Sequence, residues 1–317
     1  MIETLMPWLR AIYYDLLQRS AEFKVWQSSL NELTTLALPP TFLIGCGRSG
    51  TTILGRALSC HPNIFYLFEP YHLWAALDPI TDVLNLYHRI DAHLLMNASH
   101  CTEQSRYRFN RLFIKASSNT NGSVLLEKTP LNAMRIGYLN ALSPSSKFIH
   151  IIRDGVDVAY SIDRIALTNS YKIAGKPKLN QWWGVENYKW KALARDGAAA
   201  GYYADELHQL KDHRSKGAYE WLVSLAEVDR ARQQLGDRLY EMTYEQLTAN
   251  PKAALQDIFE FLGLNSPTAL LDRAASMIDP TSHSIGKFLS LPPVMCEAFN
   301  SYQESFGFSN RSVSLPL

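Results

Sequence analysis

Residues 41–52 combine a short apolar run, a glycine loop and an amphipathic segment, and they constrain the fold more than any other part of the chain. The run 41–44 predicts a buried strand, and residues 51–58 predict a helix. Between the two, Gly45 and Gly50 enclose four residues. A strand, a glycine loop and a helix in this order present free backbone N–H groups and the positive end of a helix. The segment therefore predicts a site for a phosphate-like group.

The loop differs from the nucleotide loop of kinases in the position of its cation. The glycine spacing is that of G-x-x-x-x-G-K-[ST], but Thr51 stands where that motif has lysine. A kinase or ATPase needs the lysine on the phosphates of Mg-ATP. Here the cation comes earlier, at Arg48, and Thr51 and Thr52 open the helix. The ligand predicted for this loop is therefore a phosphate-like group other than the tail of Mg-ATP.

Two further blocks place cations at the ends of apolar strands. Residues 147–161 read KFIHIIRDGVDVAYS, so that a strand ends at Arg153 and the following helix carries Ser161. An arginine and a serine in these positions can converge on one dianion. Residues 125–130 read LLEKTP and put Lys128 at the end of another apolar run.

The three blocks resemble those of sulfotransferases that use 3′-phosphoadenosine 5′-phosphosulfate (PAPS), over roughly residues 40–287. The resemblance implies that the glycine loop binds the 5′-phosphosulfate through Arg48, Ser49, Gly50, Thr51 and Thr52. It also implies that Arg153 and Ser161 bind the 3′-phosphate. A later loop, residues 281–287, resembles the segment that closes over the nucleotide, with Ser284 and Lys287 as candidates; a solvated turn is the alternative.

Within the family, the intervals from Arg48 to Glu69, Lys128 and Arg153 are most similar to those of the tyrosylprotein sulfotransferases. The matching glutamate is the proposed base in that branch, and Lys128 matches the catalytic lysine. Glu69 follows four apolar or aromatic residues, and desolvation makes a carboxylate a stronger base. The alternative is a structural role in which Glu69 caps a helix or pairs with Arg48, and His72 is the rival base.

Sulfuryl transfer requires positioning and charge stabilisation more than covalent chemistry. Lys128, with Arg48 beside it, is the candidate for stabilising the bridging oxygen as it takes up charge. Glu127 should face the opposite side of the sheet, because side chains alternate along a strand. No carboxylate cluster has metal-ligand spacing, so we expect no metal.

Strands are predicted near residues 42–44, 65–68, 124–127, 148–152 and 238–243. Helices are predicted at 51–59, 77–93, 132–142, 156–167, 182–200 and 219–235. This alternation predicts an α/β fold with three layers, a parallel sheet flanked by helices, in the P-loop-NTPase-like form of the sulfotransferases. Ligands of such sheets bind at the carboxyl ends of the strands, where the predicted site residues fall.

We expect residues 1–38 to form an N-terminal amphipathic helical lead-in. Residues 39–317 would form a single sulfotransferase domain with inserts near 97–122 and 169–180, which either close over the substrate or are exposed connections. Trp182, Trp183, Tyr188 and Trp190 are expected in the core more than as an acceptor platform. Cys46 is interpreted as a small loop residue in preference to a reactive thiol.

The charge balance gives no electrostatic reason to expect nucleic acid as a partner. Lys plus Arg total 31 and Asp plus Glu 30, a formal net charge of +1. The N-terminal residues do not have the form of a signal peptide, and no run approaches the ~18 apolar residues of a membrane span. We therefore expect a cytoplasmic enzyme without a transmembrane segment.

The acceptor is expected to be a hydroxyl of a small molecule, a glycan, a lipid or a tyrosine, and the sequence does not choose among them. The oligomeric state is open, a homodimer included. Two alternatives to a sulfotransferase are a P-loop kinase-like phosphotransferase, against which Thr51 argues, and a nucleotide-binding protein without catalysis.

Overall fold

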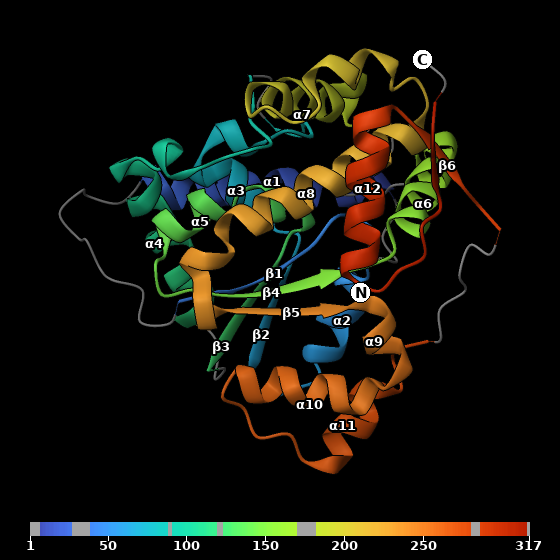
Figure 1. Cartoon of the computed structure of the whole chain (residues 1–317). Helices are drawn as coiled ribbons and strands as arrows, with labels where there is room; N and C mark the ends of the chain where they lie inside the picture. The colour runs from blue at the N-terminus through green and yellow to red at the C-terminus, as the bar shows by residue number, and fades with distance from the viewer. Residues whose placement is uncertain are drawn as a thin grey trace.

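The computed structural model describes residues 7–26, 39–87, 91–118, 123–169, 182–279 and 286–315 (Figure 1). Its centre is a parallel sheet in the order β2-β3-β1-β4-β5. The strands are β1 (Thr41–Ile44), β2 (Ile64–Phe68), β3 (Val124–Lys128), β4 (Lys147–Ile152) and β5 (Leu239–Thr243). β1 and β3 are buried throughout, as expected for inner parallel strands covered on both faces.

Helices cover both faces of the sheet (Figure 1). One face packs Phe42, Leu125 and Phe148 against four helices: α3 (Tyr71–Leu77), α4 (Glu103–Ser118), α5 (Ile136–Leu142) and α8 (His213–Leu235). The other face packs Leu43 and Ile149 against α2 (Thr51–Leu58), α9 (Tyr244–Ala249), α10 (Pro251–Phe261) and α11 (Thr268–Ala275). The predicted α/β class, a parallel sheet flanked by helices, is confirmed.

The remaining elements extend these layers. α6 (Gly155–Thr168) packs against α8, and α1 (Pro7–Trp26) packs against α3 and α4. α7 (Tyr188–Ala199) and α12 (Pro293–Ser305) also contact α8, and the short strands β6 (Leu289–Leu291) and β7 (Ser312–Ser314) pair in parallel. Short 3-10 turns span Pro79–Thr81, Ala98–His100, Pro130–Met134, Val185–Asn187, Ala204–Gln209 and Gly236–Arg238. None of the helices in the described ranges has both the length and the apolar composition of a membrane-spanning segment.

The helix predicted at residues 77–93 is wrong. α3 begins earlier, at Tyr71, and ends at Leu77. Proline at position 79 starts a single 3-10 turn whose N-cap is Asp78. The carboxylate of Asp82 then accepts the backbone N–H groups of Leu86 and Tyr87. Apolar spacing predicted a helix here, but side chains that bond to the local backbone replace the helical hydrogen bonds.

Other helices also differ from the prediction: α8 begins at His213 and not at residue 219, and α9 to α12 were not predicted. The segment 132–142 is divided between a 3-10 turn, Pro130–Met134, and α5. α7 starts at Tyr188, six residues after the predicted start, because Gly184 and Asn187 adopt positive φ. α4 was not predicted, although its Phe109 and Phe113 stack 4.4 Å apart in the core.

Candidate functional site

The glycine loop between β1 and α2 depends on two glycines. A Cβ at Gly45 would lie 2.4 Å from the carbonyl oxygen of Ile151 on β4. Gly50 has a φ of 96° and is the N-cap of α2. A Cβ there would lie 2.3 Å from the ring of Tyr244. The loop therefore lies close against its neighbours and directs the N-terminus of α2 toward the carboxyl edge of the sheet.

Arg48 joins the two blocks that were predicted to bind phosphates. Its Nε donates a hydrogen bond to Oγ of Ser161 on α6 at 3.1 Å. Its carbonyl oxygen accepts from Nη1 of Arg153 at 3.4 Å. Arg48 has a φ of 76°, in the left-handed region that a residue with a side chain rarely adopts. Such strain is typical of binding sites.

Arg153 follows β4 and is held by long contacts. Its Nη2 lies 3.5 Å from Oδ2 of Asp157, and its guanidinium is 4.9 Å from the ring centroid of Tyr244. Tyr244 therefore contacts both the glycine loop and Arg153, a role that the sequence analysis missed. The available signal was its position, one residue past the predicted strand 238–243.

Lys128 lies at the end of β3 with no exposed surface. Its Nζ contacts the carboxylate of Glu69 and donates to Oγ1 of Thr52 at 2.8 Å. The same atom is 4.7 Å from the ring centroid of Phe68. Burial lowers the pKa of Lys128, and the charge of Glu69 opposes that effect. The end of β3, the residue after β2 and the first turn of α2 thus bring a lysine, a carboxylate and a hydroxyl together.

Glu69 is fixed beside Lys128 by the backbone as well as by its side chain. Its backbone N–H donates to the carbonyl oxygen of Lys128 at 2.8 Å. Glu69 has a φ of 42°, a second non-glycine residue in the left-handed region. Since β2 pairs with β3 in register up to Phe68 and Lys128, the chain turns at Glu69 toward the carboxyl edge.

Glu127 points to the opposite face of β3, as the strand alternation predicts. Its buried carboxylate accepts hydrogen bonds from Trp74, Thr129 and Asn132. Burial raises the pKa of Glu127 to about 7, although these hydrogen bonds oppose the increase. Glu127 therefore anchors α3 and the 3-10 turn after β3 and does not belong to the site.

The other predicted site residues differ in their surroundings. Ser49 and Thr51 are buried, and Oγ of Ser49 has no hydrogen-bond partner among the described residues. Nζ of Lys287 lies 4.7 Å from the ring centroid of Tyr160 on α6. Ser284 lies outside the described residues.

His72, the rival base, lies on α3 and is surrounded differently from Glu69. Burial lowers its pKa to about 4, and the charge of Lys24 on α1 adds to this effect. Cys46 in the glycine loop is buried, and burial raises the pKa of its thiol. Both surroundings oppose the charged form of the side chain.

The ring of Trp182 packs against the glycine loop at Gly47. A Cβ at Gly47 would lie 2.4 Å from its ring. Its Nε1 donates to Glu220 at 3.1 Å, and Glu220 also accepts from the buried Lys189 at 2.7 and 2.8 Å. Trp182 and Trp183 are buried, in agreement with the expected core role.

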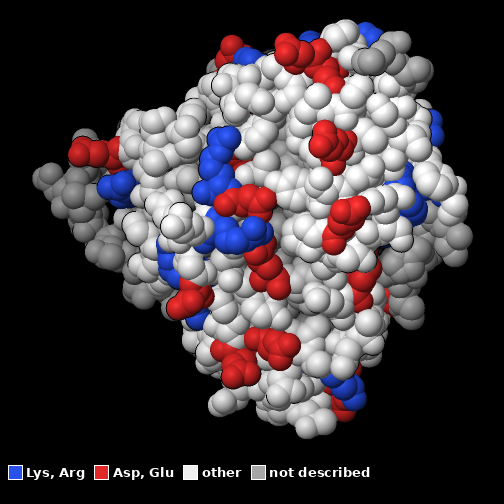
Figure 2. Space-filling view, viewed as in Figure 1, with Lys and Arg blue, Asp and Glu red and all other residues white. Residues whose placement is uncertain are grey.

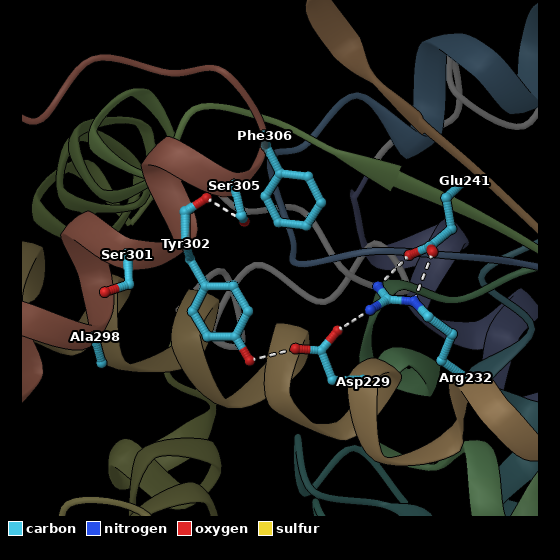
Figure 3. Close-up of a pocket in the computed structure, with 8 residues that line it drawn as sticks. All are labelled: Asp229, Arg232, Glu241, Ala298, Ser301, Tyr302, Ser305 and Phe306. Atoms are coloured by element: carbon cyan, nitrogen blue, oxygen red, sulfur yellow. Dashed lines mark hydrogen bonds and ion pairs between the residues drawn. The ribbon is translucent and has the colours of Figure 1, made fainter.

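A cavity of about 580 Å³ lies elsewhere, between α8, α12 and β5 (Figure 3). Its polar groups bind one another: Tyr302 donates to Asp229 at 2.6 Å, and Arg232 donates twice to Glu241 at 2.9 Å. On the same face, acidic and basic side chains are interspersed (Figure 2). Within the described ranges, no group of three or more His, Cys, Asp or Glu side chains could hold a metal ion.

A sequence model of the sulfotransferase family matches residues 39–268, well over half of the chain. The protein therefore belongs to the sulfotransferase family. Its sequence is 32% identical over 129 residues to the nodulation protein NoeE of Sinorhizobium fredii. This match covers 38% of this chain and 30% of that protein. The chain is 22% identical over 240 residues to an uncharacterized protein of Aquifex aeolicus. That match covers 71% of this chain and 25% of the relative. The matched part thus spans between a quarter and a third of these relatives.

A solved structure agrees with the fold. The sulfotransferase domain of the Synechococcus PCC 7002 olefin synthase superimposes with a TM-score of 0.52 at 19% identity. The match covers 92% of this chain and all of that domain. The two proteins therefore share the same fold, a parallel sheet flanked by helices.

Proposed function

We propose that this protein transfers a sulfuryl group from PAPS to an acceptor hydroxyl by in-line displacement. The observation that carries the proposal is the contact of Lys128 with both Glu69 and Thr52, next to the glycine loop. A cation, a carboxylate and the N-terminus of a helix meet where a sulfuryl group would have to pass between two oxygens. The sulfotransferase family supports the same reaction class.

The donor would lie along the carboxyl edge of the sheet. Its 5′-phosphosulfate would be held by the loop residues Arg48, Ser49, Gly50, Thr51 and Thr52. The buried Oγ of Ser49, which has no partner among the described residues, supports this placement. The 3′-phosphate would contact Arg153 and Ser161, and Ser284 and Lys287 would complete the nucleotide site. The chain spacing favours a donor site similar to that of the tyrosylprotein sulfotransferases.

In the transfer step, the acceptor oxygen bonds to sulfur while the bond from sulfur to the 5′-phosphate oxygen breaks. Glu69 accepts the proton of the acceptor hydroxyl. Lys128 donates a hydrogen bond to the departing phosphate oxygen as its charge grows, and Arg48 adds positive charge. The product 3′,5′-diphosphoadenosine then leaves. Donor binding would turn Lys128 away from Glu69 and toward the bridging oxygen, which frees the carboxylate to act as base.

Glu69 is favoured over His72 as the base. The Glu69 carboxylate contacts Lys128, whereas the charge that acts on His72 is that of Lys24 on another helix. The kinase-like alternative is not favoured, because Thr51 stands in place of the phosphate-binding lysine and the family match is to sulfotransferases. The acceptor class remains a hydroxyl of a small molecule, glycan, lipid or tyrosine.

Thermal unfolding with added nucleotides tests the donor assignment. A ligand at ~100 times its dissociation constant adds roughly 2.7 kcal/mol of stability, which raises the Tm by a few degrees. We expect this increase with 3′,5′-diphosphoadenosine, and a smaller one with AMP at the same concentration. An increase only with ATP and magnesium would contradict the proposal and favour a phosphotransferase.

A further inference from the structure

The C-terminal segment packs against the loop that carries Arg153, although it lies beyond residues 39–268 of the family match. Oε1 of Gln303 on α12 accepts the backbone N–H of Gly155 at 2.9 Å, and Gln303 is fully buried. A Cβ at Gly155 would lie 2.6 Å from the ring of Phe299. The N-terminus of α6 is therefore positioned by α12 (Figure 1).

Arg311, just before β7, forms ion pairs with carboxylates at the N-terminus of α6. Its Nη2 pairs with Oδ2 of Asp154 and lies 3.8 Å from Oδ1 of Asp157. Asp154 also caps α6, since its Oδ1 accepts the backbone N–H groups of Val156 and Asp157. The Asp157 side chain is 1% exposed and lies 3.5 Å from Arg153 on its other side. One buried carboxylate is thus shared by two arginines.

Because Asp157 lies near both Arg153 and Arg311, its carboxylate does not bind Arg153 alone. Among the described residues, the guanidinium of Arg153 makes polar contacts at 3.4 and 3.5 Å, which are longer than the ~2.7–2.9 Å usual for charge-assisted hydrogen bonds. Without Arg311, Asp157 would lose one of the two arginines that lie near its carboxylate and would keep its contact with Arg153. Asp154 would lose its ion pair with Arg311, and Arg153 would have to balance Asp157 next to the site of an incoming dianion.

We propose that Arg311 is a positioning residue for donor recognition: by neutralising Asp154 and Asp157, it leaves Arg153 available to the 3′-phosphate. The inference rests on the proposed function, because it assumes a nucleotide with a 3′-phosphate. It assigns to the C-terminal segment a part in donor selectivity. Arg311 itself need not contact the nucleotide.

Isothermal titration with two nucleotides tests this role. The preference is the ratio of the Kd for 5′-AMP to the Kd for 3′,5′-diphosphoadenosine. In Arg311→Ala we expect this preference to fall about tenfold, within the range of coupling between neighbouring charges. The Kd for AMP should change little, because AMP lacks the 3′-phosphate. Arg230→Ala, which breaks an ion pair with Glu227 on α8, is the matched control and should retain the wild-type preference.

A second substitution separates charge from packing. Asp157→Asn in the Arg311→Ala background should restore most of the preference, because it removes the carboxylate that holds Arg153. Arg311→Lys should retain part of it, and it serves in place of Arg311→Ala if the alanine variant does not fold. A purely structural role predicts equal losses for both nucleotides, no recovery in the double variant and a lower Tm.

The outcomes distinguish this inference from the proposed function. A wild-type protein with no preference for 3′,5′-diphosphoadenosine would overturn both. A wild-type preference that survives Arg311→Ala, or that falls without recovery in Asp157→Asn/Arg311→Ala, would overturn the inference and leave the proposed function intact.

Discussion

Nε of Arg48 donates a hydrogen bond to Oγ of Ser161 at 3.1 Å, although 113 residues separate them in the chain. Arg48 belongs to the glycine loop and Ser161 to α6, so this contact joins the two segments proposed for the two phosphate ends of the donor. A ligand that binds one segment is therefore bound next to the other. The contact also uses the Nε–H of a guanidinium, a donor that lysine lacks.

Arg48→Lys should therefore bind 3′,5′-diphosphoadenosine almost as poorly as Arg48→Ala. We expect both variants to weaken the Kd on the order of tenfold or more, because a point charge does not replace the planar guanidinium. Isothermal titration measures the effect, with the exposed Arg56→Ala on α2 as control. Wild-type affinity in Arg48→Lys would mean that charge alone suffices.

Lys128→Met should reduce kcat on the order of 100-fold or more, since loss of one electrostatic stabiliser of a transition state has about this effect. Methionine keeps a long apolar stem in the fully buried position of Lys128. Rates of sulfate transfer under saturating donor measure the loss, and the Kd for 3′,5′-diphosphoadenosine shows whether the donor site remains formed. A variant with unchanged kcat would remove Lys128 from the mechanism.

Glu69→Gln should lower kcat by about 10²–10⁴-fold, the usual contribution of a general base. The amide keeps the shape of the side chain and can still accept from Lys128, so the nucleotide Kd should change little. His72→Ala is the comparison, and it should retain most of the activity. The reverse pattern, with His72→Ala inactive and Glu69→Gln active, would exchange their roles.

Gly45→Ala should destabilise the protein by at least ~2 kcal/mol, because its Cβ would meet a backbone oxygen at 2.4 Å and its φ is 152°. Gly201→Ala is the control: it also has positive φ, at 85°, but nothing lies within 4 Å of the added Cβ. We expect about 1 kcal/mol for that variant, from strain alone. Urea unfolding of both variants measures the difference, and equal effects would show that the contact with β4 does not matter.

Glu127→Gln should change how stability depends on pH. The pKa of Glu127 rises from 4.5 to about 7 on folding, so its contribution to stability is complete below pH 4.5 and is lost as pH rises to about 7. As the pH rises from 4.5 to about 7, the free energy of unfolding of the variant should therefore increase relative to that of the wild type. Asn132, whose Oδ1 has no partner among the described residues, can turn its amide to accept from the new NH₂ group. Urea unfolding at pH 4.5 and 7.5 tests this, and a difference independent of pH would contradict it.

The five strands of the central sheet were predicted to within a residue at each end, whereas the short strands β6 and β7 were not predicted. β1, β3 and β4 consist mainly of apolar residues because inner parallel strands are buried on both faces, and each ends in, or is followed by, a glycine or a cation. The helix predicted at residues 77–93 was wrong because apolar spacing does not reveal where Asp78 and Asp82 bond to the backbone. The boundaries therefore depended on short-range polar contacts.

The α/β class, and the edge of the sheet where the predicted site residues gather, follow from the amino-acid sequence, because parallel strands place their carboxyl ends together. Arg48, Glu69, Lys128 and Arg153 all fall at or just past the ends of strands that the sequence predicts.

Which of these side chains contact one another depends on how distant segments pack in three dimensions. The pairing of Lys128 with Glu69, the position of Tyr244 over Gly50 and Arg153, and the contact of Arg311 with Asp154 each join segments that are distant in the chain. Such contacts leave no local pattern, because they depend on how β2, β3, α9 and the C-terminal segment pack.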